Sequence, residues 1–399
     1  MNEEELIRLS EYIDTPSYVF DLERLTEHIR QTREKIGTEY GICFAMKANP
    51  FLVSEMSQYT DRLEVCSPGE YEICIREGIE SEKIIVSGVN KTEESMMRIL
   101  DYSKGKGIYT IESPHQYEVL RNSFLRKGCQ AEIGRRPKVI LRLSSGNQFG
   151  MDKHTLEKVL LMNYEDNVMD IIGLHFYAGT QKKMKVIKKE VEQLNEYAAY
   201  LKKTYGISEL ELEYGPGLAV SYFSGEQPED GKMLREFREE LNNLSEYKSI
   251  CIELGRYLTA DCGYYFTKVE DVKYTEDTGY VIVDGGIHQI NYFGQIMGMK
   301  QPYMTFVHQN KTEEEEVSLQ ICGSLCTAND IIVRGVMMPY PKRGDVLIFK
   351  KAGAYSVTEG MSMFLSRELP NIYMCTGDGE VICIRKRIET NLFNSKYYR

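Results

Sequence analysis

Eight short apolar runs, separated by longer stretches with a polar face, constrain the fold of this 399-residue chain most. Between the runs, segments such as Met184–Tyr205 carry apolar residues at helical spacing. Strands that alternate with helices predict a parallel sheet. Eight such units within about 240 residues match a TIM barrel; a doubly wound sheet with extra strands would look similar, but the repeat count favours the barrel. The runs are Gly41–Met46, Arg62–Cys66, Lys83–Ser87, Ile108–Glu112, Lys138–Leu143, Met169–Phe176, Glu209–Tyr214 and Lys248–Leu254.

A different pattern begins after Arg256, where apolar runs follow one another without long helices between them. Such a pattern predicts an all-β domain of antiparallel strands joined by glycine-rich turns, either a sandwich or a barrel. The early run Ser17–Phe20 is expected to join it. We therefore predict a barrel domain over 24–262 and a β domain formed by 1–23 and 263–399. The later runs are Tyr264–Val269, Tyr280–Asp284, Ser318–Cys322, Val346–Phe349 and Glu380–Arg385.

The charge and the N-terminus disfavour several classes of partner. A net charge of −11 repels nucleic acid and anionic lipid. The start of the chain is acidic, and no apolar run approaches the ~20 residues of a membrane span, so we expect a cytoplasmic protein without a signal peptide. Ten scattered cysteines suggest reduced thiols rather than disulfides. The acidic run Lys311–Glu316 is more typical of a solvated loop than of a partner-binding motif.

Residues that are unusual for a core stand at the ends of the apolar runs. TIM barrels carry their reactive residues at the C-terminal ends of the strands, so these residues together predict a ligand site. In chain order they are Lys47, Ser67 to Glu70, Ser87 with Gly88, Glu112 with Ser113, Arg142, His175, Gly215 to Gly217, and Glu253 with Gly255 and Arg256.

Each of these groups has an ordinary interpretation beside the chemical one. Lys47 is either a solvated strand end or a desolvated amine able to form an imine. The two glycine-containing turns, 215–217 and 255–256, can offer backbone N–H groups to a phosphate. Glu253 is either a structural ion-pair partner or a carboxylate for a pyridine nitrogen, and His175 by itself is typical of a core histidine. Cys322 and Cys326 lack a second ligand pair, so no metal site is expected.

With these residues in place, the chain resembles the pyridoxal-phosphate (PLP) dependent decarboxylases related to diaminopimelate and ornithine decarboxylases, whose barrel is similar to that of alanine racemase. The resemblance covers nearly the whole chain. The matching motifs are Thr15 to Asp21, Phe44-Ala45-Met46-Lys47-Ala48-Asn49, Glu64-Val65-Cys66-Ser67-Pro68-Gly69-Glu70, Gln148-Phe149-Gly150-Met151, Gly173 to Tyr177, Glu253-Leu254-Gly255-Arg256, Leu325 to Asp330 and Gly353-Ala354-Tyr355.

The resemblance implies a role for each matched residue. Lys47 would hold the cofactor as a Schiff base, His175 would stack on its ring and Glu253 would pair with its pyridinium nitrogen. The remaining cofactor contacts would come from Arg142, Gly217, Gly255, Arg256 and Tyr355. Family members are homodimers with shared active sites, so Cys326 and Asp330 would reach Lys47 of the partner chain. Cys326 would protonate the carbanion left after CO₂ departs, and Asp330 and Tyr355 would contact the substrate.

Departures from the family pattern bear on the substrate. Thr327 follows the cysteine where diaminopimelate and ornithine enzymes carry an acid, and Gln301 replaces the arginine that grips the distal carboxylate of diaminopimelate. The chain therefore resembles most the branch of specialised metabolism, which acts on siderophore intermediates or on aminoacyl groups of a carrier protein. Three alternatives stay open: a diaminopimelate, ornithine, lysine or arginine decarboxylase; a racemase; and a non-catalytic protein that has kept the fold.

Overall fold

The computed structural model describes residues 1–126, 135–226, 230–275, 278–308 and 316–396, and the chain forms two compact units. Unit 1 comprises 1–28, 220–228 and 258–399, and unit 2 comprises 29–219 and 229–257. These boundaries differ by a few residues from the predicted domains, which remain a prediction, and the segment 220–228 belongs to unit 1 rather than to the barrel. Except for Glu316, the acidic run Lys311–Glu316 lies outside the described residues.

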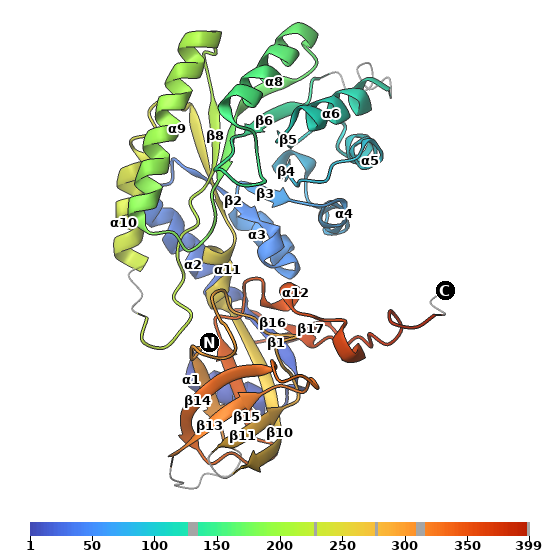
Figure 1. Ribbon diagram of the computed structural model, residues 1–399, viewed down its shortest axis with the longest axis vertical. Helices are drawn as coiled ribbons and strands as arrows, with labels where there is room; N and C mark the ends of the chain where they lie inside the picture. Colours follow the sequence, from blue (N-terminus) through green and yellow to red (C-terminus); the bar gives the residue numbers. More distant parts are fainter. Residues whose placement is uncertain (127–134, 227–229, 276–277, 309–315, 397–399) are drawn as a thin grey trace. The chain divides into compact units, whose positions relative to one another are not determined.

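Unit 2 is a closed barrel of eight parallel strands, as predicted (Figure 1). Each strand pairs with the next in sequence, and the last pairs with the first, so that Gly41 lies opposite Cys251. This arrangement excludes the doubly wound sheet. The strands are β2 (Gly41–Ala45), β3 (Arg62–Val65), β4 (Ile84–Val86), β5 (Ile108–Ile111), β6 (Lys138–Arg142), β7 (Asp170–Tyr177), β8 (Glu211–Gly215) and β9 (Ser249–Leu254).

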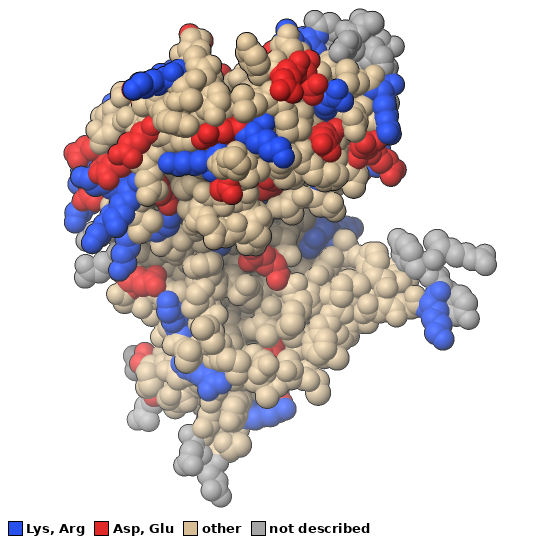
Figure 2. All heavy atoms as spheres, turned by 45° about the horizontal axis from the view of Figure 1, so that its top comes forward, with Lys and Arg blue, Asp and Glu red and all other residues tan. Residues whose placement is uncertain are grey.

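Helices surround this barrel, and Figure 2 shows acidic and basic side chains intermixed on their outer surface. Helix α9 has the predicted bounds, because its apolar residues Ile187, Val191 and Leu194 form one buried stripe. No helix in the described part of the chain is long and apolar enough to cross a membrane. The helices are α2 (Leu22–Ile36), α3 (Val53–Tyr59), α4 (Pro68–Arg76), α5 (Glu93–Ser103), α6 (Pro114–Arg126), α8 (Lys153–Asp166), α9 (Met184–Tyr205), α10 (Asp230–Leu241) and α11 (Arg256–Thr259).

The inside of the barrel is filled rather than hollow. An apolar cluster of Cys43, Ile85, Ile108, Ile140 and Cys251 occupies it, with Ile172 packed against the cluster. At the N-terminal ends of the strands, the guanidinium of Arg62 pairs with the carboxylates of Glu211 and Glu213 at 2.8 and 3.1 Å. These two carboxylates are therefore part of the structural base of the barrel. The polar groups open to a ligand lie at the other end, where the strands terminate.

Unit 1 contains a nine-stranded sheet, which confirms the predicted β domain. Two pairs of strands, β1 with β16 and β11 with β13, are parallel, so the expectation of only antiparallel neighbours was wrong. Helix α1 (Glu3–Ser10) contributes Leu6 and Leu9 to the core over this sheet. The strands are β1 (Ser17–Asp21), β10 (Gly263–Tyr274), β11 (Gly279–Val283), β12 (Met304–Val307), β13 (Glu316–Cys322), β14 (Ile331–Pro339), β15 (Val346–Lys350), β16 (Asn371–Cys375) and β17 (Val381–Arg385).

Candidate active site

Lys47 lies in the short turn that follows β2, with its amine among acidic groups of neighbouring strands. Its Nζ donates to a carboxylate oxygen of Glu64 from β3 and, at 3.3 Å, to Oε1 of Glu253 from β9. Both carboxylates are about 95% buried, whereas the lysine side chain keeps a third of its surface accessible. The barrel therefore presents one accessible amine above two buried carboxylates.

Glu253 connects the lysine to His175 on β7. The Nε2 atom of His175 lies 3.0 Å from Oε2 of Glu253, and the histidine side chain is almost fully buried. Burial by itself would raise the pKa of Glu253, but the Lys47 ammonium and the His175 hydrogen bond outweigh it and hold that pKa below its usual range. Glu253 is consequently an ionised carboxylate at neutral pH, able to accept a hydrogen bond from a cationic ring nitrogen.

Cys66, directly after β3, contacts both the amine and one of the carboxylates. Its Sγ donates to Oε1 of Glu64 at 3.2 Å and lies 3.7 Å from Nζ of Lys47. Burial, followed by the Glu64 carboxylate, raises the pKa of the Cys66 thiol well above its usual value. The residue is therefore a neutral thiol that orients Glu64, and it is not a nucleophile in this state.

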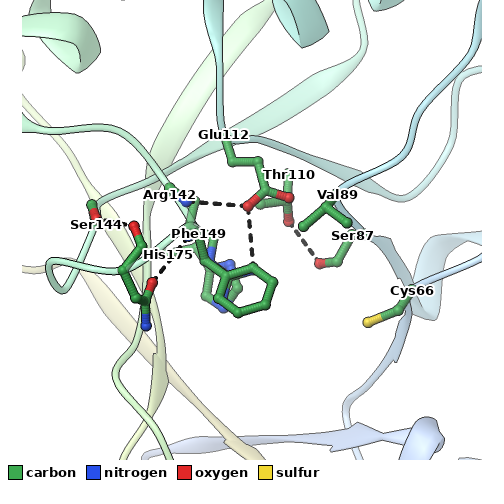
Figure 3. Close-up of polar contacts among 12 residues, drawn as sticks. Cys66, Ser87, Val89, Thr110, Glu112, Arg142, Ser144, Phe149 and His175 are labelled. Carbon is green, nitrogen blue, oxygen red and sulfur yellow. Dashed lines mark hydrogen bonds and ion pairs between the residues drawn. The ribbon is translucent and has the colours of Figure 1, made fainter.

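Arg142, at the end of β6, is held from two sides (Figure 3). Its guanidinium lies 3.5 Å from Oε2 of Glu112 and stands over the ring of Phe149 at 4.8 Å from the ring centre. The same Oε2 atom accepts the backbone N–H of Gly150 at 3.1 Å, which fixes the turn that follows β6. Glu112 therefore links the end of β5 to the end of β6 through its contact with the Arg142 guanidinium.

Two glycine turns lie beside these side chains at the ends of β8 and β9. Gly217 has φ +63°, and a Cβ there would stand 2.0 Å from the carbonyl oxygen of Gly179, so only glycine fits. A Cβ on Gly255 would stand 3.1 Å from Cβ of Ala48, which places this glycine beside the Lys47 turn. Nε of Arg256 donates to Oγ1 of Thr180 at 3.3 Å. Backbone N–H groups, a guanidinium and a hydroxyl, the kinds of group that bind anions, therefore belong to these turns and their neighbours.

The buried pair Lys182 and Glu190 supports the first of these turns. Nζ of Lys182 lies 2.7 Å from Oε2 of Glu190, and Oη of Tyr214 donates to the same oxygen at 2.7 Å. The backbone N–H of Lys182 donates to the carbonyl of Gly217 at 2.9 Å. The turn after β8 therefore rests on helix α9 through a buried ion pair.

Other strand-end residues have structural roles. Ser67 caps helix α4 by accepting the N–H of Glu70, and the Glu70 carboxylate accepts the N–H of Cys66 at 2.6 Å. Ser87 and Thr110 hydrogen-bond to each other at 3.0 Å (Figure 3). These residues therefore shape the rim of the site.

A second lysine, Lys91, lies near the barrel mouth, but its amine is engaged. It donates to the carbonyl of Gly88 at 2.6 Å and to Oε1 of Gln116 at 3.1 Å. Burial lowers its pKa to about 8. Because Lys91 is 7% exposed, Lys47 is the lysine that a ligand in the barrel mouth can reach.

Three predicted site residues belong to unit 1. Cys326 is exposed. Asp330 is 3% exposed, and its carboxylate accepts the N–H groups of Ile287 and Leu325 at 2.8 and 2.7 Å, which closes the loop that carries Cys326. Tyr355 is half-buried with φ +65°, a conformation rare for a residue with a Cβ. The roles predicted for these residues and for those in the barrel stay predictions.

Sequence reasoning missed Glu64 and Thr180. Glu64 lies inside an apolar run, where an acid needs a buried partner, and this was the signal that could have found it. Thr180 lies three residues beyond the end of β7, and nothing in its spacing pointed to Arg256. Both bring polar atoms toward residues that the resemblance had singled out.

The residues of the barrel mouth fit PLP. An accessible amine at Lys47 suits its aldehyde, the ionised Glu253 suits its ring nitrogen, and the close-packed glycine turns suit its phosphate. Buried polar atoms without a partner among the described residues include Nε of Arg142, Oε1 of Glu112 and Nδ1 of His175. Unsatisfied buried groups are costly, so several of them around one opening indicate a place built for a polar ligand.

Comparisons with known proteins agree with this chemistry. The family described as "Pyridoxal-dependent decarboxylase, pyridoxal binding domain" matches residues 22–260. The L-glutamyl-[BtrI acyl-carrier protein] decarboxylase of Niallia circulans is 26% identical over 97% of this chain and 94% of its own length. The 2-[(L-alanin-3-ylcarbamoyl)methyl]-2-hydroxybutanedioate decarboxylase of Staphylococcus aureus is 26% identical over 90% of this chain and 94% of its own length.

A solved diaminopimelate decarboxylase from M. jannaschii has a similar fold. It superimposes with a TM-score of 0.82 at 23% identity, over 98% of this chain and 94% of the other. This likeness extends through both units of the chain.

Proposed function

The chain belongs to the family of pyridoxal-dependent decarboxylases, and from this premise we propose that its substrate is a modified or carrier-bound amino acid, decarboxylated in sites shared by two copies of the chain. It is a PLP-dependent carboxy-lyase that acts on amino-acid-type substrates, as its relatives are. The observation that supports this proposal most is the Lys47 side chain, one third accessible, whose amine contacts the buried carboxylates of Glu64 and Glu253.

The barrel residues act by holding and orienting. Lys47 would hold the cofactor, and Glu253, kept ionised by Lys47 and His175, would keep a proton on the ring nitrogen. In the barrel, Gly217, Gly255 and Arg256 would bind the phosphate and Arg142 would contact the ring. Tyr355, which belongs to unit 1, would add a contact to the phosphate. When bound, PLP supplies an electron-deficient ring that takes up the electron pair released with CO₂. Glu64, which accepts a hydrogen bond from the Lys47 amine, would hold that amine whenever it is not bonded to the cofactor.

Cys326 delivers the proton that replaces the carboxylate. It is exposed on the loop that Asp330 closes, so it is presented outward from its unit. A proton donor has to lie within hydrogen-bond reach of the reacting carbon. We assign Cys326 and Asp330 to the site that contains Lys47 of the partner subunit, in line with the homodimer that the resemblance implies.

An exposed apolar patch on unit 1 supports a dimer. Its segments are joined by hydrogen bonds, since the Asn394 amide donates to the carbonyl of Met363 and the backbone N–H of Leu369 donates to the carbonyl of Ile388. Figure 2 shows a broad uncharged surface where the chain approaches its C-terminal residues. Exposed apolar residues on neighbouring segments are typical of an interface. The patch consists of Met361, Met363, Phe364, Leu365, Ile382, Ile384, Ile388, Leu392 and Phe393, each at least 36% exposed.

The residues expected to contact the far end of the substrate either carry no charge or already contact other side chains. Thr327 and Gln301 replace charged residues of the diaminopimelate enzymes. The ammonium of Lys300 lies over the ring of Phe223 and 3.9 Å from Glu226. The relatives from Niallia circulans and Staphylococcus aureus are named for a carrier-bound glutamyl group and for an amide-linked amino acid. These observations favour a substrate whose remote amine or carboxylate is masked.

The assay that tests this proposal measures CO₂ release from two groups of substrates. One group holds free diaminopimelate, ornithine, lysine and arginine; the other holds glutamate on an acyl-carrier protein and diaminopropionate joined to citrate by an amide. We expect kcat/KM for a masked substrate to exceed that for every free amino acid by about 100-fold or more, because an unpaired charge is costly to bury. Lys47→Ala should abolish all turnover.

Three outcomes would contradict it. Efficient turnover of a free diamino acid would identify a decarboxylase of primary metabolism. Cofactor binding at Lys47 without CO₂ release from any substrate would favour a non-catalytic protein, and formation of the opposite enantiomer would favour a racemase.

A further inference from the structure

We propose that the segment 293–300, together with Arg334, is a docking surface for the protein that delivers the substrate, a small acidic carrier with the amino acid attached to it. This inference rests on the proposed function, because it names the partner of the same site. Of the two masked substrates, it selects the one bound to a carrier. The 293–300 surface consists of four apolar residues and two basic ones, which are Phe293, Ile296, Met297, Met299, Lys300 and Arg334.

Four apolar side chains of this segment are exposed to solvent. The exposed fractions are 47% for Phe293, 62% for Ile296, 37% for Met297 and 67% for Met299. Single exposed apolar residues are common, but four of them between positions 293 and 299 form a local apolar surface. Methionine side chains adapt their shape to a partner, which suits a protein that has to leave after every turnover. The segment therefore has the composition of a transient interface.

The backbone of the segment is held in place although these side chains are exposed. Nε2 of Gln295 donates to the carbonyls of Lys300 at 2.6 Å and of Ile332 at 3.2 Å. The backbone N–H of Arg334 donates to the carbonyl of Gly298 at 2.9 Å. A Cβ on Gly298 would stand 2.8 Å from a side-chain atom of β14, so this glycine lets the segment lie directly on that strand. A fixed backbone lowers the entropic cost of binding a partner.

Two cations adjoin the apolar side chains. The Lys300 side chain is 51% exposed, and its ammonium lies 4.6 Å from the ring centre of Phe223 and 3.9 Å from Oε1 of Glu226. Such an exposed ion pair is weak, so Lys300 can exchange Glu226 for an acid of a partner. Nε of Arg334 donates to the carbonyl of Met297 at 2.7 Å, and its guanidinium contacts no carboxylate among the residues that the structure describes. Both cations can therefore bind an acidic protein.

The two cations matter because the chain as a whole is acidic. A net charge of −11 repels an acidic partner at long range. At physiological ionic strength, charges more than about 8 Å apart are largely screened, so the groups in direct contact decide the outcome. An apolar centre with basic groups at its margin is complementary to a partner whose surface is acidic and partly apolar.

The segment is adjacent in sequence to the residue expected at the far end of the substrate. Gln301, directly after Lys300, stands where the resemblance places the contact to the distal carboxylate of diaminopimelate. A carrier has to be attached at that distal end, because the α-amino and α-carboxylate groups must reach the cofactor. A group that extends from the substrate beyond Gln301 comes next to the exposed side chains of Met299 and Lys300. The carrier protein would therefore make contact at the 293–300 surface.

The experiment compares two forms of one substrate with the holoenzyme. The carrier form is glutamate joined through its side-chain carboxyl group to the acyl-carrier protein for which the Niallia circulans relative is named, and the short form is the same thioester of N-acetylcysteamine. We expect the double variant Lys300→Glu/Arg334→Glu to raise KM for the carrier form about tenfold or more, because the inverted charges repel the acidic partner. Both kcat and KM for the short form should stay within about twofold.

Two further variants separate the apolar contribution from a general effect of charge. Ile296→Ser should also raise KM for the carrier form, by a smaller factor, and leave the short form unchanged. Lys188→Glu, at a position of helix α9 whose side chain is 59% exposed, is the matched control and should change neither form.

The proposal is overturned if the double variant changes KM for both forms equally or for neither. It is also overturned if the holoenzyme releases CO₂ from the citrate amide but not from the carrier form; the proposed function then stands, since that substrate is masked as well. Dissociation of the double variant in sedimentation velocity would assign the surface to a second copy of the chain instead. If no masked substrate is decarboxylated, the proposed function fails, and this inference fails with it.

Discussion

The barrel mouth of unit 2 and the Cys326 loop of unit 1 are organised in opposite ways. In the mouth, Lys47, Glu64, Glu253 and His175 form one connected set of contacts, and three of the four are buried. In the loop, the buried residue is Asp330, whose carboxylate binds backbone N–H groups, while Cys326 is exposed. The polar side chains of the barrel mouth are therefore mostly buried within their unit, whereas the thiol of the loop is exposed on the surface of its unit.

This difference suggests that the two regions have different roles, cofactor binding in the barrel and proton donation by the loop. Residues that hold a cofactor benefit from a rigid, preorganised pocket within one unit. A proton donor on an exposed loop needs a surface from outside its unit before it is enclosed, and the apolar patch near the C-terminal residues supplies a reason for two chains to associate. The two regions are therefore parts of one site only in the dimer that we propose.

Removing the thiol of Cys326 should have the largest effect on this comparison. Cys326→Ser should lower kcat by roughly 10²- to 10⁴-fold, the usual contribution of a positioned acid, while leaving the absorption of the bound cofactor unchanged. Steady-state CO₂ release and the cofactor spectrum check this. Cys322→Ser, in β13 of the same unit, is the matched control and should keep full activity. A normal kcat for Cys326→Ser would place the proton donor elsewhere.

A charge in the apolar patch should disrupt the dimer without changing any residue of the barrel mouth or of the Cys326 loop. Ile384 is 40% exposed on β17, and a carboxylate buried at its position would cost several kcal/mol. Ile384→Glu should weaken dimerisation by on the order of 100-fold in sedimentation velocity, with activity lost in proportion. Leu161→Glu on helix α8, at a position 51% exposed, should remain dimeric and active. An active monomer would refute the shared site.

Acid should lower the stability of unit 1 through His288. This histidine is 2% exposed, and burial followed by the charge of Arg367 lowers its pKa from 6.5 to about 4. The folded chain thus binds the proton less tightly than the unfolded chain, so stability is full above pH 6.5 and is lost as the pH falls toward 4. At 1.36 kcal/mol per pKa unit, this corresponds to about 3 kcal/mol.

Chemical denaturation at pH 7 and pH 4 measures that loss. His288→Phe should lose less stability between the two values than the original chain, whereas His115→Phe, at an exposed position on α6, should behave like the original chain. Equal losses in the original chain and in His288→Phe would show that this histidine is not the source.

The barrel could be read from the sequence because its strands are short, continuous apolar runs with polar residues at one end. The eight predicted runs correspond to β2 through β9, and the lysine after the first run is the amine that the structure leaves accessible. Strand β14 escaped prediction because Arg334 and Gly335, the latter at φ +64°, interrupt its apolar pattern. Strand β16, which directly follows Pro370, was also missed.

The contacts between side chains could not be predicted, since spacing shows which residues share a strand end but not how they pair. The sequence indicated Lys47, His175 and Glu253 separately, and the structure joins them through hydrogen bonds. It gave no sign that Glu64 would receive the amine or that Glu112 would hold Arg142. Ion pairs across a barrel depend on which strands become neighbours, which is a property of the closed sheet.

Mixing two inactive variants tests the shared site most directly. Lys47→Ala lacks the cofactor lysine and Cys326→Ala lacks the proton donor, so each homodimer should be inactive. Coexpression of the two chains should form heterodimers with one complete site, and random assembly should restore about a quarter of the original activity. If both catalytic residues acted within one chain, every site in the mixture would lack one of them, and activity would stay at the level of the separate variants.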